Sequence, residues 1–215
     1  MKSLLLFWRE AIRKPQSIGA FGPSSPSVAR SMTLPLKGHT APARVLEVGS
    51  GTGAVTEAIL EHLNPADTLD MCELNPEFVK LLREKFETGE GAPGPRVRVF
   101  EGDVLEKAGA QYDFIISSVP ASNLPPEVVG RLLEGLVARL APGGVLACLH
   151  YRGQGIRARL AIGKERQRLR RVISVIKSYQ RRHGCGKDTV WLSLPPAEIH
   201  YLARDPRAQK PIIAA

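Results

Sequence analysis

The chain has 215 residues, 43% of them hydrophobic, which is enough for one domain of ordinary size with a full core. No apolar run approaches the roughly 20 residues that a membrane-spanning helix needs, and the three cysteines lack the spacing of a disulfide framework or a metal site, which fits a reducing cytosol. The formal net charge of +9 favours a polyanionic partner, either a nucleic acid or an anionic membrane surface.

Residues 1–14 predict a short amphipathic helix that ends at Pro15. Two roles remain open for it. The helix packs on the protein's own core, or it lies in a membrane interface with aromatic side chains among the headgroups and basic side chains facing anionic lipid. We favour the interfacial role and expect membrane contacts from Lys2, Leu5, Phe7, Trp8, Arg9, Ile12 and Arg13.

A second helix is expected to begin at Pro26, because Ser25 is a suitable N-cap and proline is favoured at the first helical position. We expect residues 1–36 to form the membrane-binding helix and a segment that covers a bound ligand, with Ser24 and Ser25 among its contacts. Residues 37–205 would form the main domain, in which 152–188 is a basic helical insertion or lid.

Strand and helix patterns then alternate along the chain. Strands are expected at residues 45–48, 69–73, 97–101, 114–117 and 145–150, and helices at 56–63, 76–87 and 126–140. Pro142-Gly-Gly144 is expected to end the last helix, and Thr189 to Ala203 predicts two short antiparallel strands around a Pro-Pro break. This order predicts an α/β fold with a mostly parallel sheet covered by helices on both faces.

The first strand runs into a glycine-rich turn, Val45-Leu-Glu-Val-Gly-Ser-Gly-Thr-Gly53. Its alternate glycines let the backbone turn tightly and approach a ligand with no Cβ in the way. Glu73 closes the next strand about 20 residues on, where a Rossmann-type domain places its ribose contact, and Asp103 follows the third strand. This ordered set resembles the class I S-adenosylmethionine-dependent methyltransferases, whose fold is Rossmann-like with a seven-stranded sheet.

The resemblance implies S-adenosylmethionine as cofactor and S-adenosylhomocysteine as product. The glycines would shape the loop beneath the amino acid end of the cofactor, Glu73 would accept hydrogen bonds from the ribose hydroxyls, and Asp103 would bind the adenine amino group. The full set of expected cofactor contacts is Ser24, Ser25, Glu47, Gly49, Gly51, Gly53, Glu73, Leu74, Asp103, Val104 and Ser117. A dinucleotide is set aside, because its usual fingerprint is Gly-x-Gly-x-x-Gly.

The segment from Arg152 to Lys187 carries twelve Lys or Arg residues against the single acid Glu165. A solvated helix face is the ordinary interpretation of a charge run, but one this one-sided repels itself unless a polyanion faces it. Gly184-Cys-Gly186 is expected to be a flexible joint, so that the segment moves over the substrate as a lid.

The fourth strand ends in Ser117-Ser118-Val119-Pro120. Adenine-methylating relatives have an Asn-Pro-Pro-Tyr or Asn-Leu-Pro-Tyr motif there, and this chain keeps the proline but lacks both the Asn and the stacking aromatic residue. That departure favours an aliphatic amine over a nucleobase. We expect Ser117, Ser118 and Tyr151 to hold the reacting amine, and Tyr151, Arg152, Tyr179 and Arg181 to contact the rest of the substrate.

Both ends of the chain carry a closer resemblance. Phe7-Trp-Arg-Glu, Pro15, Ile18-Gly-Ala and Pro23-Ser-Ser, with Val190-Trp-Leu-Ser-Leu-Pro-Pro-Ala197 and Tyr201, look like the bacterial phospholipid N-methyltransferases. This resemblance implies methylation of phosphatidylethanolamine, up to phosphatidylcholine, by an enzyme bound peripherally to the cytoplasmic face of the inner membrane. We expect a monomer without a nucleic-acid partner. The alternatives are a relative of the ribosomal RNA adenine dimethyltransferases and a non-catalytic membrane-binding module, which the intact set of cofactor residues disfavours.

Overall fold

A computed structural model describes residues 24–89, 91–106, 110–152, 160–193 and 196–207. The predicted N-terminal helix lies outside these residues. The described chain opens with α2 (Pro26–Met32) and a 3-10 turn, η1 (Leu34–Leu36). Ser25 caps α2 as expected, because its side chain accepts the backbone N–H of Val28 at 3.4 Å.

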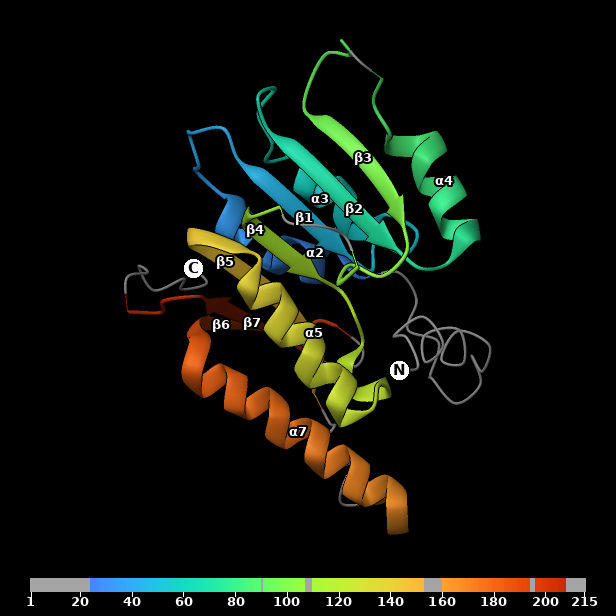
Figure 1. The fold of residues 1–215 in the computed structure, drawn as a ribbon, viewed down its shortest axis with the longest axis vertical. Coiled ribbons are helices and arrows are strands. Elements are labelled where there is room, and N and C mark those ends of the chain that lie inside the picture. Colours follow the sequence, from blue (N-terminus) through green and yellow to red (C-terminus); the bar gives the residue numbers. More distant parts are fainter. Residues whose placement is uncertain (1–23, 90, 107–109, 153–159, 194–195, 208–215) are drawn as a thin grey trace.

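Seven strands form one sheet in the order β3-β2-β1-β4-β5-β7-β6 (Figure 1). Their bounds are β1 (Arg44–Val48), β2 (Thr68–Glu73), β3 (Arg96–Glu101), β4 (Tyr112–Ser117), β5 (Leu140–Tyr151), β6 (Gly184–Val190) and β7 (Ala197–Ala203). Strands β1 to β5 pair in parallel, whereas β7 is antiparallel to both β5 and β6. The predicted α/β fold is therefore confirmed.

Helices cover both faces of the sheet. The remaining helices are α3 (Ala54–Leu60), α4 (Pro76–Phe86), the 3-10 turn η2 (Ala121–Asn123), α5 (Pro126–Ala138) and α7 (Gly163–His183). One core contains buried side chains of α2, α3 and α4, and the other contains those of α5 and α7. The strands supply both cores alternately, so the sheet is buried on each side, as a parallel sheet requires.

Two sequence expectations about the second half of the sheet are wrong. Pro142-Gly-Gly144 lies inside β5, where the pairing with β4 shifts register between Tyr112 and Phe114, instead of forming a turn before the strand. A Cβ at Gly144 would lie 2.9 Å from the Tyr112 carbonyl oxygen, so glycine permits this close approach.

The expected flexible joint is also absent. Gly184 to Gly186 begins β6 and pairs with β7, so the glycines belong to the sheet. Helix α7 is correspondingly not a separate flap, because Val172 and Ile176 are buried in the core that it shares with α5. None of the described helices is both long and apolar enough to cross a bilayer.

Candidate functional site

The loop after β1 is held in a conformation that only glycine adopts easily. Gly49, Gly51 and Gly53 have φ angles of 76°, 57° and 90°. A Cβ at Gly49 would lie 3.3 Å from Val119 Cγ2, and a Cβ at Gly53 would overlap the Phe86 ring. The loop therefore packs closely between the end of β4 and α4, and Gly49 lines the cleft described below.

Glu47 is fully buried one residue before the end of β1. Its Oε2 accepts a hydrogen bond from Thr56 Oγ1 at 2.7 Å, whereas its Oε1 is buried with no partner among the described residues. Burial raises the pKa of this carboxyl to about 7, against the opposing hydrogen bond from Thr56. A buried carboxylate oxygen without a partner is a position that a ligand cation or N–H donor would satisfy.

Glu73 is the last residue of β2, and its carboxylate binds the glycine loop to the end of this strand. Its Oε2 accepts the backbone N–H of Gly51 at 2.9 Å, and its Oε1 accepts those of Leu74 and Asn75 at 2.8 and 2.9 Å. The side chain is buried yet lines the cleft. Glu73 thus has a structural role in addition to any contact with a ligand.

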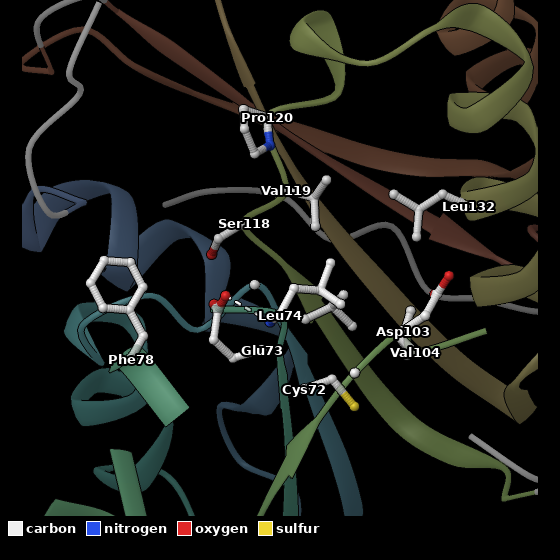
Figure 2. A pocket seen from close by; sticks show the side chains of 13 residues that line it. Cys72, Glu73, Leu74, Phe78, Asp103, Val104, Ser118, Val119, Pro120 and Leu132 are labelled. Atoms are coloured by element: carbon white, nitrogen blue, oxygen red, sulfur yellow. Dashed lines mark hydrogen bonds between the residues drawn. The ribbon is translucent and has the colours of Figure 1, made fainter. Parts of the chain in front are cut away.

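A cleft of about 690 Å³, open to solvent, lies at the carboxyl ends of β1, β2, β3 and β4. Figure 2 shows Glu73 and Asp103 on either side of Leu74 in this cleft. The lining residues are Val48, Gly49, Cys72, Glu73, Leu74, Phe78, Gly102, Asp103, Val104, Ser118, Val119, Pro120 and Leu132.

The Asp103 side of the cleft is suited to a flat ring that carries an amino group. Asp103 Oδ1 accepts the backbone N–H of Leu105 at 2.9 Å, which fixes the carboxyl beside the apolar side chains of Val104 and Leu132. The rest of the lining includes Gly49 of the glycine loop and Glu73. Glu47, Gly51 and Gly53 are not among the lining residues. The cleft therefore combines apolar side chains with the carboxylates of Glu73 and Asp103.

Ser117 and Ser118 occupy different positions although they are adjacent. Ser117 is buried in the last position of β4, paired with Val48 and Cys148, and does not line the cleft. Ser118 lines the cleft, and its hydroxyl approaches Met32 Sδ at 3.9 Å, a weak interaction that leaves it able to bind a ligand. The structure thus brings Ser118, and not Ser117, to the cleft surface.

Tyr151 and Arg152 lie at the carboxyl end of β5, on the same edge of the sheet as the cleft, but neither lines it. Tyr151 is half-buried, and burial raises its pKa. Arg152 lies over the Trp191 ring at 4.4 Å from its centroid and 3.6 Å from Glu198 Oε1. Ser24 and Ser25 are partly buried before α2 and are not among the cleft residues either.

Tyr179 and Arg181 lie at the wrong end of α7 for the expected substrate contacts. The Tyr179 hydroxyl donates to the Gly130 carbonyl at 3.3 Å, and Arg182 lies over its ring. Four residues after Tyr179, His183 contacts the carbonyl of Ala203, the last residue of antiparallel β7. This is the amino edge of the parallel strands, opposite the cleft.

Sequence reasoning missed several cleft residues, above all Phe78, Val119 and Leu132. Phe78 had a local signal, because Asn75 caps α4 and Phe78 lies in its first turn, beside the end of β2. Leu132 comes from the middle of α5 and had none, because its place depends on how α5 packs across the sheet.

Comparisons with known proteins agree with this geometry. Residues 46–146 match the family described as "Methyltransferase domain". An ornithine lipid N-methyltransferase of Singulisphaera acidiphila is 32% identical over 151 residues, which cover 67% of this chain and 76% of that protein. A ribosomal RNA small subunit methyltransferase A of Parasynechococcus marenigrum is 41% identical over 97 residues, 45% of this chain and 30% of that longer protein.

Among solved structures, an O-methyltransferase from Bacillus cereus in complex with SAH has a TM-score of 0.62 to this chain. The superposition covers 92% of this chain and 90% of the other, at 15% sequence identity. At that identity the likeness concerns the fold. It is the fold that places the cleft at the carboxyl edge of the sheet.

Proposed function

Because the chain belongs to the class I S-adenosylmethionine-dependent methyltransferases, with S-adenosylmethionine as its cofactor, we propose that it methylates the primary amine of a membrane lipid. The resemblance at both ends of the sequence favours phosphatidylethanolamine as the substrate. The name of the Singulisphaera relative suggests ornithine lipid. Both carry a primary aliphatic amine, which is the group that the cleft must receive.

The residues present fit the cofactor. The amino acid end would lie over the glycine loop at Gly49, which lines the cleft, whereas the unpaired Oε1 of Glu47 is buried behind that loop. The ribose would lie against Glu73, and the adenine between Val104 and Leu132 with its amino group toward Asp103. Phe78 is placed to cover the open side of the cleft.

When bound, the cofactor supplies a methyl group on a positively charged sulfur, which an amine lone pair can attack in line. A free alkylamine has a pKa near ~10, so the protein must favour its neutral form, as desolvation beside a positive charge does. Ser118 lies on the cleft wall, where its hydroxyl or carbonyl oxygen can accept an N–H of the amine and orient the nitrogen.

The observation that carries the proposal is the composition of the wall formed by Ser118, Val119 and Pro120. It presents one hydroxyl and apolar atoms, with no aromatic ring to stack on a base and no side-chain amide to hold a planar amino group. An aliphatic amine needs only a short polar contact and exclusion of water. The identity to the Singulisphaera lipid N-methyltransferase supports the same acceptor class.

Methyl-labelled S-adenosylmethionine tests the proposal directly. The protein would be mixed with the labelled cofactor and with vesicles of phosphatidylethanolamine or ornithine lipid, phosphatidylcholine vesicles lacking a free amine, or ribosomal RNA. We expect label in one or both amine lipids and none in phosphatidylcholine. Label in RNA without label in either amine lipid would overturn the proposal in favour of an RNA methyltransferase, the class of the Parasynechococcus relative.

A further inference from the structure

The large exposed apolar side chains of the described residues follow strand ends at one edge of the sheet. Six large hydrophobic side chains are more than a third exposed, and we call them the apolar rim: Phe78, Leu81, Leu160, Ile162, Trp191 and Leu192. They follow the ends of β2, β5 and β6, and β6 runs parallel to β5 because both are antiparallel to β7. These three ends lie at the carboxyl edge of the sheet, where the cleft opens.

The β6–β7 connection presents the most exposed pair of neighbours. Trp191 is 67% exposed and Leu192 is 89% exposed. Arg152 lies over the Trp191 ring and within 3.6 Å of Glu198. The indole therefore packs against a side chain that links the end of β5 to β7. An exposed tryptophan with a supporting cation is typical of membrane–water interfaces, where an amphipathic ring sits at headgroup level.

The first turns of α7 add positive charge beside the apolar side chains that precede them. Ile162, 89% exposed, directly precedes α7. Glu165 is the one acid of the helix, and Arg168 neutralises it through two contacts at 2.7 and 2.8 Å. Lys164, Arg166 and Arg170 are exposed, and none has an ion-pair partner among the described residues. Their charge remains available to an anionic surface.

We propose that the apolar rim is a docking surface for an anionic lipid bilayer. Phe78 belongs both to the rim and to the cleft lining, so docking places the mouth of the cleft at headgroup level. Exposed apolar tips next to unpaired cations are complementary to a surface that has an apolar interior and negative headgroups. The reason for docking rests on the proposed lipid substrate, whereas vesicle binding can be measured without that substrate.

Vesicles of phosphatidylglycerol and phosphatidylcholine test docking without any amine lipid, so a failure of the proposed substrate cannot affect the result. In sedimentation, the full-length W191S/L192S variant should bind these vesicles about tenfold more weakly than the unchanged protein, because two apolar side chains no longer leave water. Unchanged binding of S-adenosylhomocysteine would show that the variant is folded. Equal vesicle binding by the variant would overturn the inference.

A matched pair of charge variants tests the orientation. K164A/R166A removes one Lys and one Arg from the start of α7, and K177A/R181A removes the same two residue types about 20 Å farther along the helix. With a screening length of about 8 Å, the first pair should weaken binding about tenfold and the second by less than about twofold. Equal losses would contradict docking by the rim and indicate attraction to the whole helix.

Fluorescence distinguishes a bilayer from a segment of the chain itself as the occupant of the rim. The chain has two tryptophans, so W8F leaves Trp191 as the reporter. On addition of vesicles its emission should shift to shorter wavelength and be quenched by brominated lipid. Emission that is already short in wavelength, protected from iodide and insensitive to vesicles would show that Trp191 is covered by the protein, and would overturn the inference.

Discussion

The two halves of the sheet differ in whether they contain buried carboxylates. The donor half consists of β1, β2 and β3 with the loops around them, and the acceptor half consists of β4 to β7 with α5 and α7. All four buried carboxylates of the described residues belong to the donor half: Glu47, Asp67, Asp70 and Glu73. The buried polar side chains of the acceptor half are uncharged: those of Ser117, Ser122 and Ser193 and the tyrosines Tyr112 and Tyr201.

Most of this buried charge is paired within the protein. Buried carboxylates are costly unless they are paired, and three of the four have full sets of partners, such as Arg98 and Tyr112 for Asp70. Glu47, with one unpaired oxygen, is the exception. The donor half therefore keeps carboxylates inside the protein, most of them paired there, whereas the acceptor half offers an apolar wall and leaves its charges on the surface.

The largest effect is expected from Gly53→Ala in the donor half. The φ of 90° costs an alanine roughly 1–2 kcal/mol, and overlap with Phe86 adds roughly 1–3 kcal/mol. In urea, the free energy of unfolding should fall by about 3 kcal/mol. Adding Phe86→Leu to the same chain should restore the part of this loss that is due to the overlap. Gly51→Ala is the matched control, because its Cβ meets nothing within 4 Å and only the φ cost remains. Equal losses for the two alanines would show that the loop is not packed as described.

Glu73→Ala should come next. It removes the acceptor of three backbone N–H groups as well as the expected ribose contact, so affinity for S-adenosylhomocysteine should fall about a hundredfold in calorimetry. Glu101→Ala is the control, because Glu101 pairs with Glu73 in register but is exposed and does not line the cleft. A comparable loss for both variants would indicate a general charge effect instead of a specific contact.

Glu47→Gln tests the buried charge of the donor half through the pH dependence of the free energy of unfolding. Burial raises the pKa of Glu47 from 4.5 to about 7 in the folded protein, so the folded state holds its proton more tightly than the unfolded state does. The free energy of unfolding should therefore fall as pH rises from 4.5 toward 7, and remain lowered above that. Glutamine has no proton to lose, so the variant should gain on the order of 2 kcal/mol over the unchanged protein across this window. A constant difference between the two unfolding curves would mean that Glu47 ionises normally.

Arg168→Ala in the acceptor half should have the smallest effect on cofactor binding. Arg168 Nη1 donates to the carbonyls of Ser122 and Leu124 at 3.0 and 2.9 Å and so ties α7 to η2. Its loss should lower the free energy of unfolding by about 1 kcal/mol, whereas exposed Arg170→Ala should change it little. Affinity for S-adenosylhomocysteine should remain unchanged in both. A tenfold loss would break the division into two halves.

Local sequence signals were sufficient where one segment determines the structure. Residues that are neighbours in the chain predict the β1–loop–α3 unit and the start of α4 at Asn75-Pro76. They also predict the succession of the first five strands along the chain. The sequence failed at Gly184 to Gly186, because the pairing of these glycines with β7 is non-local and outweighs their low strand propensity. It also failed for Tyr179, since a helix of 21 residues carries its last turns about 30 Å from its start.

Helix α2 depends on the opposite end of the described chain. Its seven residues are too few to form a stable helix alone, and its partners are Asp188, which accepts from Ser31 Oγ at 2.6 Å, and Tyr201, which donates to the Ser31 carbonyl at 2.8 Å. These contacts span 157 and 170 residues. During synthesis α2 emerges early and can pack on α3, but these two hydrogen bonds form only once the β6–β7 hairpin exists, so the last strands fix the position of the first described helix.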